Sequence, residues 1–337
     1  MEPIQVIDSH TEGNPTRVIL GGFPIPKNKT LLERVNYLKK KQDHLRKILN
    51  HEPRGNGMMC SVLVMPPMIT GCDYSLIIME QDEYVPMCGH CIIGTATTLV
   101  YAKKIKQKKS PVTIKFHTLA GIVECKVYIR NGNVDYVSFI NVESFLLNQN
   151  YKIKTKSYGK INVDVAFGGD YYAIVNADKL KIKLNLQNDQ EIIKCANEIS
   201  AEMLKKKFPH PKNKKINRCY MVQFISNKKI NKKNSSKTTV VAPPGAIDRS
   251  PCGTGTSARV AQLFTKGKLK LNKKFHNEGP LGTKFIGKAI SCKMENKILY
   301  IRPQISGRAY ITGINQIILD KNDPIQNGFR VGSKGKL

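Results

Sequence analysis

Two stretches of this chain begin with the same dipeptide and continue as similar helical segments. The first, CGHCIIGTATTLVYAKKIK, occupies residues 88–106, and the second, CGTGTSARVAQLFTKGKLK, occupies residues 252–270. Aligned without a gap at an offset of 164 residues, they pair Cys88 with Cys252, Leu99 with Leu263 and Lys104 with Lys268. This offset is close to half of the 337-residue chain. The repeat therefore predicts two matched halves, each with a Cys-Gly pair opening a helix of small residues.

The rest of the chain reads as short strands joined by Gly and Asn turns, with few helices between them. This pattern indicates an antiparallel α+β protein rather than a doubly wound sheet. We expect a first half over residues 1–160 and a second half over 161–314, with 315–337 packing back on the first. The matched helix starts predict a pseudo-two-fold arrangement in which both cysteines face one cleft.

The helical period is clearest in three segments besides the first cysteine stretch, at residues 31–49, 189–207 and 255–266. Strand patterns are expected at residues 18–20, 61–65, 75–80, 112–116, 121–129, 135–140, 161–166, 171–175, 220–225, 238–242, 298–303 and 317–320.

The charge balance is strongly basic, with 55 Lys and Arg against 25 Asp and Glu and a formal net charge of +30. Such a balance is typical of nucleic-acid-binding proteins. However, 44 of the basic residues are Lys and only 11 are Arg, whereas base readout and bidentate phosphate contacts favour Arg. The Lys also fall in short runs between apolar segments. We therefore interpret them as solvated loops and expect no specific nucleic-acid partner.

The nine cysteines are an odd count for a set of disulfides. The N-terminus shows no basic and apolar signal-peptide pattern, and no apolar run approaches the ~18 residues of a membrane span. We therefore expect a cytoplasmic protein with reduced thiols and no membrane partner. Most of these cysteines would then be small core residues, and one or two would be reactive.

A helix N-terminus suits proton transfer by a cysteine. Its unpaired N–H groups and partial positive charge lower a thiol pKa and bind a carboxylate. Glycine at the next position lets a substrate approach the backbone. A thiolate and a thiol across one cleft could remove a proton α to a carboxylate and return it on the other face. On the residues alone, His90 and Asp248 are either local capping groups or substrate contacts.

These motifs resemble the signature elements of the proline racemase family, which includes proline racemases, 4-hydroxyproline epimerases and hydroxyproline dehydratases. The resemblance covers nearly the whole chain. It rests on residues 87–90, 248–259, 8–17, 52–59, 166–175, 305–313 and 323–329.

The resemblance implies a diaminopimelate-epimerase-like fold, in which each of two similar α/β halves wraps a sheet around a central helix. It also implies a homodimer that needs no cofactor or metal and acts on a small imino acid. By position, Cys88 and Cys252 are the acid/base pair. The remaining implied contacts are Gly89, His90, Gly253 and Thr254 to the carboxylate and ring, and Asp248 to the ring nitrogen.

Within the family, the presence of Cys252 favours epimerisation over dehydration, because the dehydratases have Thr at this position. The sequence around Asp248, the segment after the second cysteine element and the 189–218 region are similar to 4-hydroxyproline epimerases, which is the activity we expect. Proline racemase is the alternative. Departures from the family pattern are Cys91 in place of Gly, Asn56 in place of His and Arg308 in place of an aromatic residue.

A third hypothesis comes from Cys88 and Cys91, which form a Cys-x-x-Cys pair at a helix start, typical of thiol-disulfide oxidoreductases. Against it, the chain has no Trp before the pair, and the matching position in the second half is Gly255. A zinc site at Cys88, His90 and Cys91 is disfavoured because the three residues crowd one helical turn and no second ligand pair completes a tetrahedron.

Overall fold

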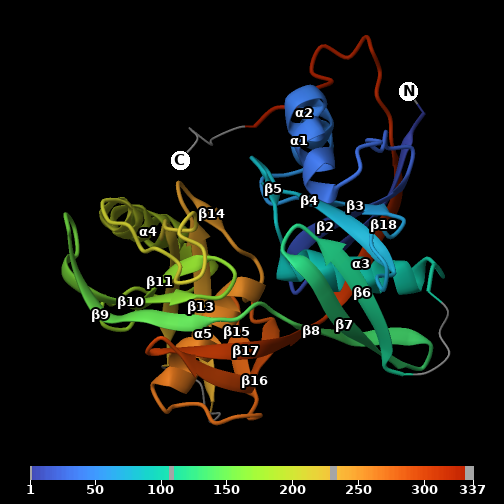
Figure 1. Cartoon of the computed structure of the whole chain (residues 1–337). Coiled ribbons are helices and arrows are strands. Elements are labelled where there is room, and N and C mark those ends of the chain that lie inside the picture. Colours follow the sequence, from blue (N-terminus) through green and yellow to red (C-terminus); the bar gives the residue numbers. More distant parts are fainter. Residues whose placement is uncertain (1, 106–109, 228–233, 331–337) are drawn as a thin grey trace. The chain divides into compact units, whose positions relative to one another are not determined.

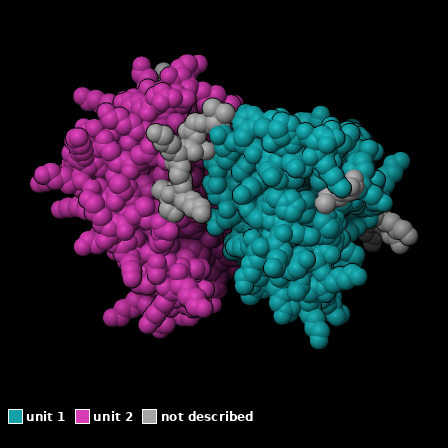
Figure 2. All heavy atoms as spheres, turned by 90° about the horizontal axis from the view of Figure 1, so that it is seen from above, with its two compact units in different colours: residues 1–139, 307–336 teal, residues 140–306, 337 magenta. Residues whose placement is uncertain are grey.

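The computed structural model describes residues 2–105, 110–227 and 234–330. The described residues form two compact units, residues 2–139 with 307–330, and residues 140–306 (Figure 2). The predicted halves divide at residues 160 and 314, whereas these units divide at 139 and 306. The strand at residues 145–155 pairs with the strand at 159–167, which is why it belongs with the second unit.

The first unit holds three helices and nine strands among its described residues (Figure 1). Its helices are α1 (Leu31–Lys41), α2 (Asp43–Asn50) and α3 (Gly89–Tyr101). Its strands are β1 (Ile4–Thr11), β2 (Asn14–Gly21), β3 (Cys60–Met65), β4 (Tyr74–Met79), β5 (Tyr84–Val85), β6 (Val112–Thr118), β7 (Gly121–Arg130), β8 (Asn133–Ile140) and β18 (Ala309–Ile317).

The second unit holds a similar set of elements. Its helices are α4 (Asp189–Leu204) and α5 (Gly253–Thr265), with a short 3-10 turn, η1 (Leu186–Asn188). Its strands are β9 (Phe145–Thr155), β10 (Gly159–Phe167), β11 (Tyr171–Asn176), β12 (Met221–Ser226), β13 (Ser235–Ala242), β14 (Ala246–Ile247), β15 (Phe275–Glu278), β16 (Lys284–Glu295) and β17 (Ile298–Gly307).

The strand pairings of the two units repeat one another. In the first unit, β18–β1 and β1–β2 are antiparallel, β2–β3 is parallel, β3–β4 is antiparallel and β4–β6 is parallel. In the second, β9–β10 and β10–β11 are antiparallel, β11–β12 is parallel, β12–β13 is antiparallel and β13–β15 is parallel. The prediction of two similar halves is confirmed, as is the mixed α and β class.

The two cysteine stretches form α3 and α5, the central helices of their units. Both end in the same register, since Lys104 N–H donates to the Leu99 carbonyl at 2.9 Å and Lys268 N–H donates to the Leu263 carbonyl at 2.8 Å. Every residue of α3 from Gly89 to Val100 is buried. A helix that is apolar or small all round has no face for water and packs inside a sheet.

Small residues let the sheets approach these helices. A Cβ on Gly94 of α3 would lie 3.0 Å from Thr16 Oγ1 and 3.2 Å from Ser9 Oγ. In the second unit, a Cβ on Gly168 would lie 2.2 Å from the Thr254 carbonyl oxygen of α5. The approach is tight at Gly94, and at Gly168 it is closer than a residue with a Cβ allows unless the backbone shifts.

Three expected segments differ from the structure. The helix expected over residues 31–49 is two helices, because Gln42 leaves the helical conformation and caps both. The strand expected at 317–320 is wrong, since β18 ends at Ile317. The helix expected over 189–207 ends at Leu204. Among the described helices, none is both long and apolar enough to cross a membrane.

Candidate functional site

Cys88 lies at the N-terminus of the buried helix α3. It is the N-cap residue, with extended backbone angles of φ −141° and ψ 120°, and Gly89 is the first helical residue. Its side chain makes no capping hydrogen bond to the helix, so it does not occupy the first N–H groups. The first turn contains no acidic residue, and the helix dipole therefore presents its positive end beside this half-buried thiol.

His90 is buried beneath Cys88 and is held by the β1–β2 hairpin. Thr11 Oγ1 donates to the His90 carbonyl at 2.9 Å, and Asn14 Nδ2 lies 3.4 Å from the ring Nδ1 and 3.3 Å from Nε2. The two ring nitrogens face different sulfurs. Nδ1 lies 3.1 Å from Cys88 Sγ, and Nε2 lies 3.5 Å from Cys91 Sγ.

Cys60 is a member of this cluster that the sequence analysis did not select. It begins β3, and its sulfur lies within 4.8 Å of the nearest ligand atoms of His90 and Cys91, with all three residues buried. No sequence signal marks it, because it lies about thirty positions from Cys91 and is an ordinary strand residue. Only the parallel pairing of β3 with β2 brings it to the start of α3.

The contacts in this cluster shift the pKa values of Cys88 and Cys91 in opposite directions. The hydrogen bond from Cys91 lowers the pKa of Cys88 well below its usual range, against the opposing effect of burial, and the nearby His90 lowers it further. Burial alone would lower the pKa of His90, but the charges of Cys88 and Cys60 raise it well above its usual value. These shifts favour a Cys88 thiolate beside a His90 imidazolium.

Two neighbouring groups, Cys91 and Glu80, have raised pKa values, which favour their protonated forms. Burial raises the pKa of the Cys91 thiol well above its usual value, and its hydrogen bonds to Cys60 and Cys88 add to the shift. Burial likewise raises the pKa of Glu80 well above its usual value, with Cys60 and Cys88 adding to the effect. Cys91 is therefore the proton donor of the cluster, and the Glu80 carboxyl favours its neutral form.

Cys252 occupies the equivalent N-cap position of α5 in the second unit. Its backbone has φ 64° and ψ 119°, a left-handed conformation that is rare for a residue with a Cβ. Its sulfur accepts a hydrogen bond from Gly255 N–H at 3.3 Å. Strain of this kind persists where surrounding structure imposes it, and it is frequent at functional sites.

Two hydroxyl groups surround the Cys252 sulfur. Tyr172 of β11 places its hydroxyl oxygen 3.4 Å from Sγ and 2.6 Å from Thr254 Oγ1, and Thr254 Oγ1 itself lies 3.6 Å from Sγ. Thr254 was a predicted site residue. Tyr172 was not, although it lies within one of the motifs that suggested the family.

Asp248 connects to Cys252 through one intervening side chain. Asp248 Oδ1 accepts from the Ser250 N–H at 2.8 Å and from Ser250 Oγ at 2.9 Å, and Ser250 Oγ accepts from the Cys252 N–H at 3.1 Å. The half-buried Asp248 thus has the local turn role that the sequence analysis left open.

The environment of Cys252 favours the neutral thiol. Burial raises the pKa of Cys252 to about 12, and the charge of Asp248 contributes to this rise against the hydrogen bonds from Tyr172 and Gly255. The two N-cap cysteines therefore differ at neutral pH, with a thiolate favoured at Cys88 and a thiol at Cys252.

Within each unit, the predicted site residues lie together. Cys88, Gly89 and His90 occupy the first turn of α3, and Asp248, Cys252, Gly253 and Thr254 occupy the start of α5 and the turn before it. Each unit thus offers a cysteine sulfur beside backbone N–H groups that suit a carboxylate.

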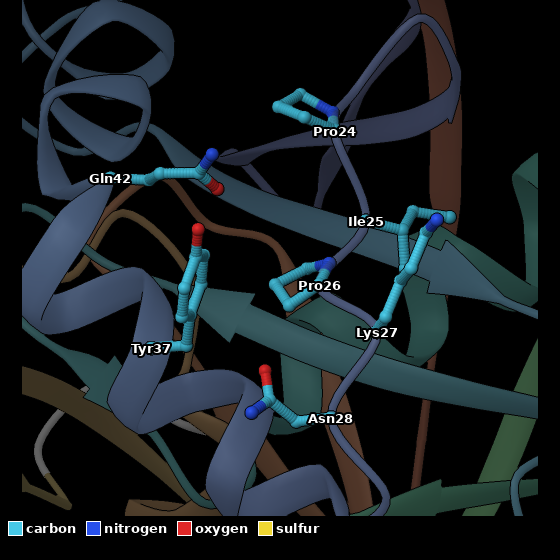
Figure 3. Close-up of a pocket in the computed structure, with 7 residues that line it drawn as sticks. All are labelled: Pro24, Ile25, Pro26, Lys27, Asn28, Tyr37 and Gln42. Carbon is cyan, nitrogen blue, oxygen red and sulfur yellow. The ribbon is translucent and has the colours of Figure 1, made fainter.

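Two cavities elsewhere do not involve these residues. One, of about 520 Å³, lies between helix α1 and the segment before it, with Tyr37 and Gln42 facing Pro24–Asn28 (Figure 3). The other, of about 600 Å³, lies at the far end of α5 and includes Asp164 and Arg259. Neither is lined by a cysteine.

Comparisons with known proteins agree with the resemblance. The family model described as proline racemase matches residues 6–330. A 4-hydroxyproline 2-epimerase of Streptosporangium roseum is 36% identical over 324 residues, covering 96% of this chain and 97% of the relative. A proline racemase of Acetoanaerobium sticklandii is also 36% identical, over 330 residues and 97% and 98% of the two chains.

A solved structure matches in fold as well. The crystal structure of a hydroxyproline epimerase from Agrobacterium vitis, with bound trans-4-hydroxy-L-proline, aligns with a TM-score of 0.88 and 28% identity, covering 98% of this chain and 95% of that one. The expected diaminopimelate-epimerase-like fold is thereby confirmed. With the family model covering nearly every residue, the chain belongs to the proline racemase family of racemases and epimerases.

Proposed function

We propose that this protein is a cofactor-independent 4-hydroxyproline epimerase that interconverts trans-4-hydroxy-L-proline and cis-4-hydroxy-D-proline. The observation that supports this most directly is the N-cap cysteine of a buried central helix in each unit, Cys88 and Cys252. Two such cysteines meet the need of an inversion, in which one group removes the α proton and another supplies a proton from the opposite face.

In the proposed mechanism, the thiolate of Cys88 accepts the α proton of one stereoisomer and becomes a thiol. The electron pair of the broken C–H bond delocalises into the substrate carboxylate. The Cys252 thiol then delivers its proton to the opposite face and becomes a thiolate. The reverse reaction exchanges the roles. Before another turnover in the same direction, the Cys88 thiol releases its proton to water and the Cys252 thiolate takes one up, and this exchange also brings solvent deuterium to the α carbon.

The remaining residues would hold the substrate. The N–H groups at Gly89 and His90, and at Gly253 and Thr254, suit the carboxylate because helix N-termini bind anions. Asp248 would pair with the ring ammonium. Tyr172 contacts both Cys252 and Thr254, and we assign it as a positioning residue for the proton donor.

The choice of 4-hydroxyproline rests on sequence features near the site, while relatives of both activities share 36% identity with this chain. Proline racemase is therefore the alternative within the family. The Cys88–Cys91 redox hypothesis has less support, because the second unit repeats the N-cap cysteine but has Gly255 at the position that matches Cys91.

The deciding experiment incubates the purified protein in deuterium oxide with trans-4-hydroxy-L-proline or L-proline and follows deuterium at the α carbon. We expect exchange and inversion of hydroxyproline, faster than of proline, and loss of inversion in both Cys88→Ser and Cys252→Ser. Faster exchange of proline would establish the racemase. Absence of exchange with both substrates would refute the function, and insulin reduction dependent on Cys91 would establish the redox alternative.

We also propose a cytoplasmic homodimer. All nine cysteines are free in the structure, which is consistent with a reducing compartment, and the family resemblance implies the dimer. Light scattering should give about twice the chain mass of 37.8 kDa. A monomer that retains full activity would contradict the dimer, and localisation of a tagged chain tests the compartment.

A further inference from the structure

Three side chains of metal-ligating type lie close together in the first unit. Cys60 comes from the start of β3, and His90 and Cys91 come from the first turn of α3. One ligand atom from each lies within 4.8 Å of the others, and all three residues are buried. They are nearly sealed from water, since Cys60 is 6% exposed, His90 6% and Cys91 0%.

Tertiary structure supplies the donor that the sequence analysis found missing. In the sequence, a zinc site at Cys88, His90 and Cys91 is disfavoured because the three crowd one turn and no second ligand pair completes a tetrahedron. In the fold, β2 and β3 run parallel with Thr16 opposite Cys60. Because α3 packs against β1, β2 and β3, the Cys60 sulfur reaches the turn that carries His90 and Cys91. The set then contains two thiols and an imidazole from two separate elements.

The orientation of the ring gives each nitrogen its own partner. Nε2 faces Cys91 at 3.5 Å, on the side of the three-residue cluster, while Nδ1 faces Cys88 at 3.1 Å. A histidine that binds a metal through one nitrogen commonly donates the other N–H to an acceptor. Here Cys88 Sγ is positioned as that acceptor. A cation bound at Nε2 would replace the contact of Nε2 with Asn14.

The spacing of the donors suits a tetrahedral thiophilic ion. Zn–S bonds of about 2.3 Å and Zn–N bonds of about 2.0 Å place donor atoms roughly 3.5–3.8 Å apart at tetrahedral angles. The donors here lie within 4.8 Å of one another and therefore need to close by no more than about 1.3 Å. Two thiolates and an imidazole select zinc and similar soft or borderline cations over magnesium or calcium.

We propose that Cys60, Cys91 and His90 Nε2 form a binding site for a zinc-type divalent cation, whose occupancy inhibits the enzyme. Binding replaces the S–H bonds of the two cysteines with metal–sulfur bonds and the Nε2–H bond of the imidazolium with a metal–nitrogen bond. The three protons are released to solvent, and the Nδ1–H remains directed at Cys88. A water molecule can complete the fourth position. The inhibitory part rests on the proposed function, because two of the cation's ligands, His90 and Cys91, belong to the turn of α3 whose N–H groups would hold the substrate. The binding part does not depend on it.

The test uses the full-length reduced protein after chelator treatment, with Co²⁺ as a spectroscopic probe. We expect one Co²⁺ per chain, with thiolate-to-cobalt charge-transfer absorption and the visible bands of tetrahedral Co²⁺, displaced by Zn²⁺. Loss of one ligand in Cys60→Ser or Cys91→Ser should weaken binding by more than roughly 100-fold, since outer-shell changes alone cost about 10–100-fold. Cys72→Ser and Cys292→Ser, which alter cysteines outside the cluster, should bind as the unmodified protein does.

Circular dichroism shows whether each variant is folded, and Cys91→Ala replaces Cys91→Ser if the latter is not. Absence of the charge-transfer band would overturn the proposal. So would unchanged Co²⁺ affinity in folded variants of both Cys60 and Cys91, or loss of binding in the Cys292 variant.

Activity measurements test inhibition separately from cation binding. α-Deuterium exchange on hydroxyproline should fall as Zn²⁺ fills the site, and each variant is compared with its own metal-free rate. Co²⁺ binding in a protein that shows no exchange even when metal-free would refute the proposed function and leave the cation site intact. Exchange that is unaffected at full occupancy would refute the inhibition.

Discussion

Replacing Gly168 with alanine tests how closely the second sheet must approach its central helix. Gly168 follows β10, and an added Cβ would lie 2.2 Å from the Thr254 carbonyl oxygen and 2.4 Å from the Ala258 backbone nitrogen. Both atoms belong to the backbone of α5, so neither can rotate away as a flexible side chain would. The helix or the β10–β11 turn must therefore move.

The expected loss in the free energy of unfolding follows from the cost of overpacking a protein interior, which is typically about 1–3 kcal/mol. Contact with two backbone atoms places Gly168→Ala near the upper end, about 3 kcal/mol. For a domain of about this size, each kcal/mol lowers the melting temperature by roughly 2–4 °C, which predicts a fall of about 6–12 °C. The displaced residues lie in the helix that begins at Cys252, so the rate of α-deuterium exchange should fall as well.

Gly245→Ala is the matched control in the same unit. Its Cβ would meet Ile193 Cγ2 at 3.5 Å, an ordinary contact, and its backbone lies outside the left-handed region. Alanine there should be neutral or stabilise by about 0.4–1 kcal/mol by restricting the unfolded chain. Scanning calorimetry and circular dichroism compare the two variants with the unmodified protein. Equal melting temperatures for the two variants would refute the close approach.

Three other predictions address acidity and buried contacts. Tyr172→Phe removes the hydroxyl at the Cys252 sulfur, and kcat/KM for hydroxyproline should fall about 5–30-fold for the loss of about 1–2 kcal/mol. The melting temperature should fall by only the few degrees that the lost hydrogen bond to Thr254 is worth, and an unchanged rate would exclude the positioning role. Iodoacetamide should label Cys88 at neutral pH, because its lowered pKa keeps it a thiolate until the pH falls well below the usual range of thiol pKa values. Cys252 has a pKa of about 12 and should react only when the solution becomes strongly alkaline. Peptide mass spectrometry at several pH values measures both, and faster labelling of Cys252 would contradict the assignment. Arg17→Met should destabilise by about 3–5 kcal/mol in urea unfolding, since it leaves the half-buried Asp8 carboxylate without its 2.8 Å partner and the Leu49 and Arg54 carbonyls without their donor. A loss below about 1 kcal/mol would show that the pair is dispensable.

Local patterns were sufficient for the elements that depend on near neighbours in the chain. The Cys-Gly starts of α3 and α5 and their common register were predictable because the small residues and the helix-ending pattern lie within each stretch. Gln42 shows the limit of such reasoning. The apolar period continues through it, yet the chain breaks there into α1 and α2, because periodicity reports which face is buried and not whether the backbone bends.

The alternation and turn signals also missed whole strands. β1, β9, β15 and β16 were not predicted, and β9 and β16 each alternate between buried and exposed positions at only part of their length. Their conformation is imposed by pairing with neighbours that lie elsewhere in the chain, such as β10 and β17. Strand formation depends on such partners more than helix formation does.

In the candidate site, too, some features follow from the local sequence and others only from the tertiary structure. The amino-acid sequence alone determined that the chain has two matched halves and that a cysteine begins the central helix of each, since these features are written in contiguous residues. Tertiary structure decided which groups surround those cysteines. Cys60 reaches His90 through the parallel pairing of β2 and β3, and Tyr172 reaches Cys252 from β11. Acidity depends on burial and on charges within a few ångströms, so the difference between the Cys88 and Cys252 thiols arises only when the folded chain brings these neighbours together.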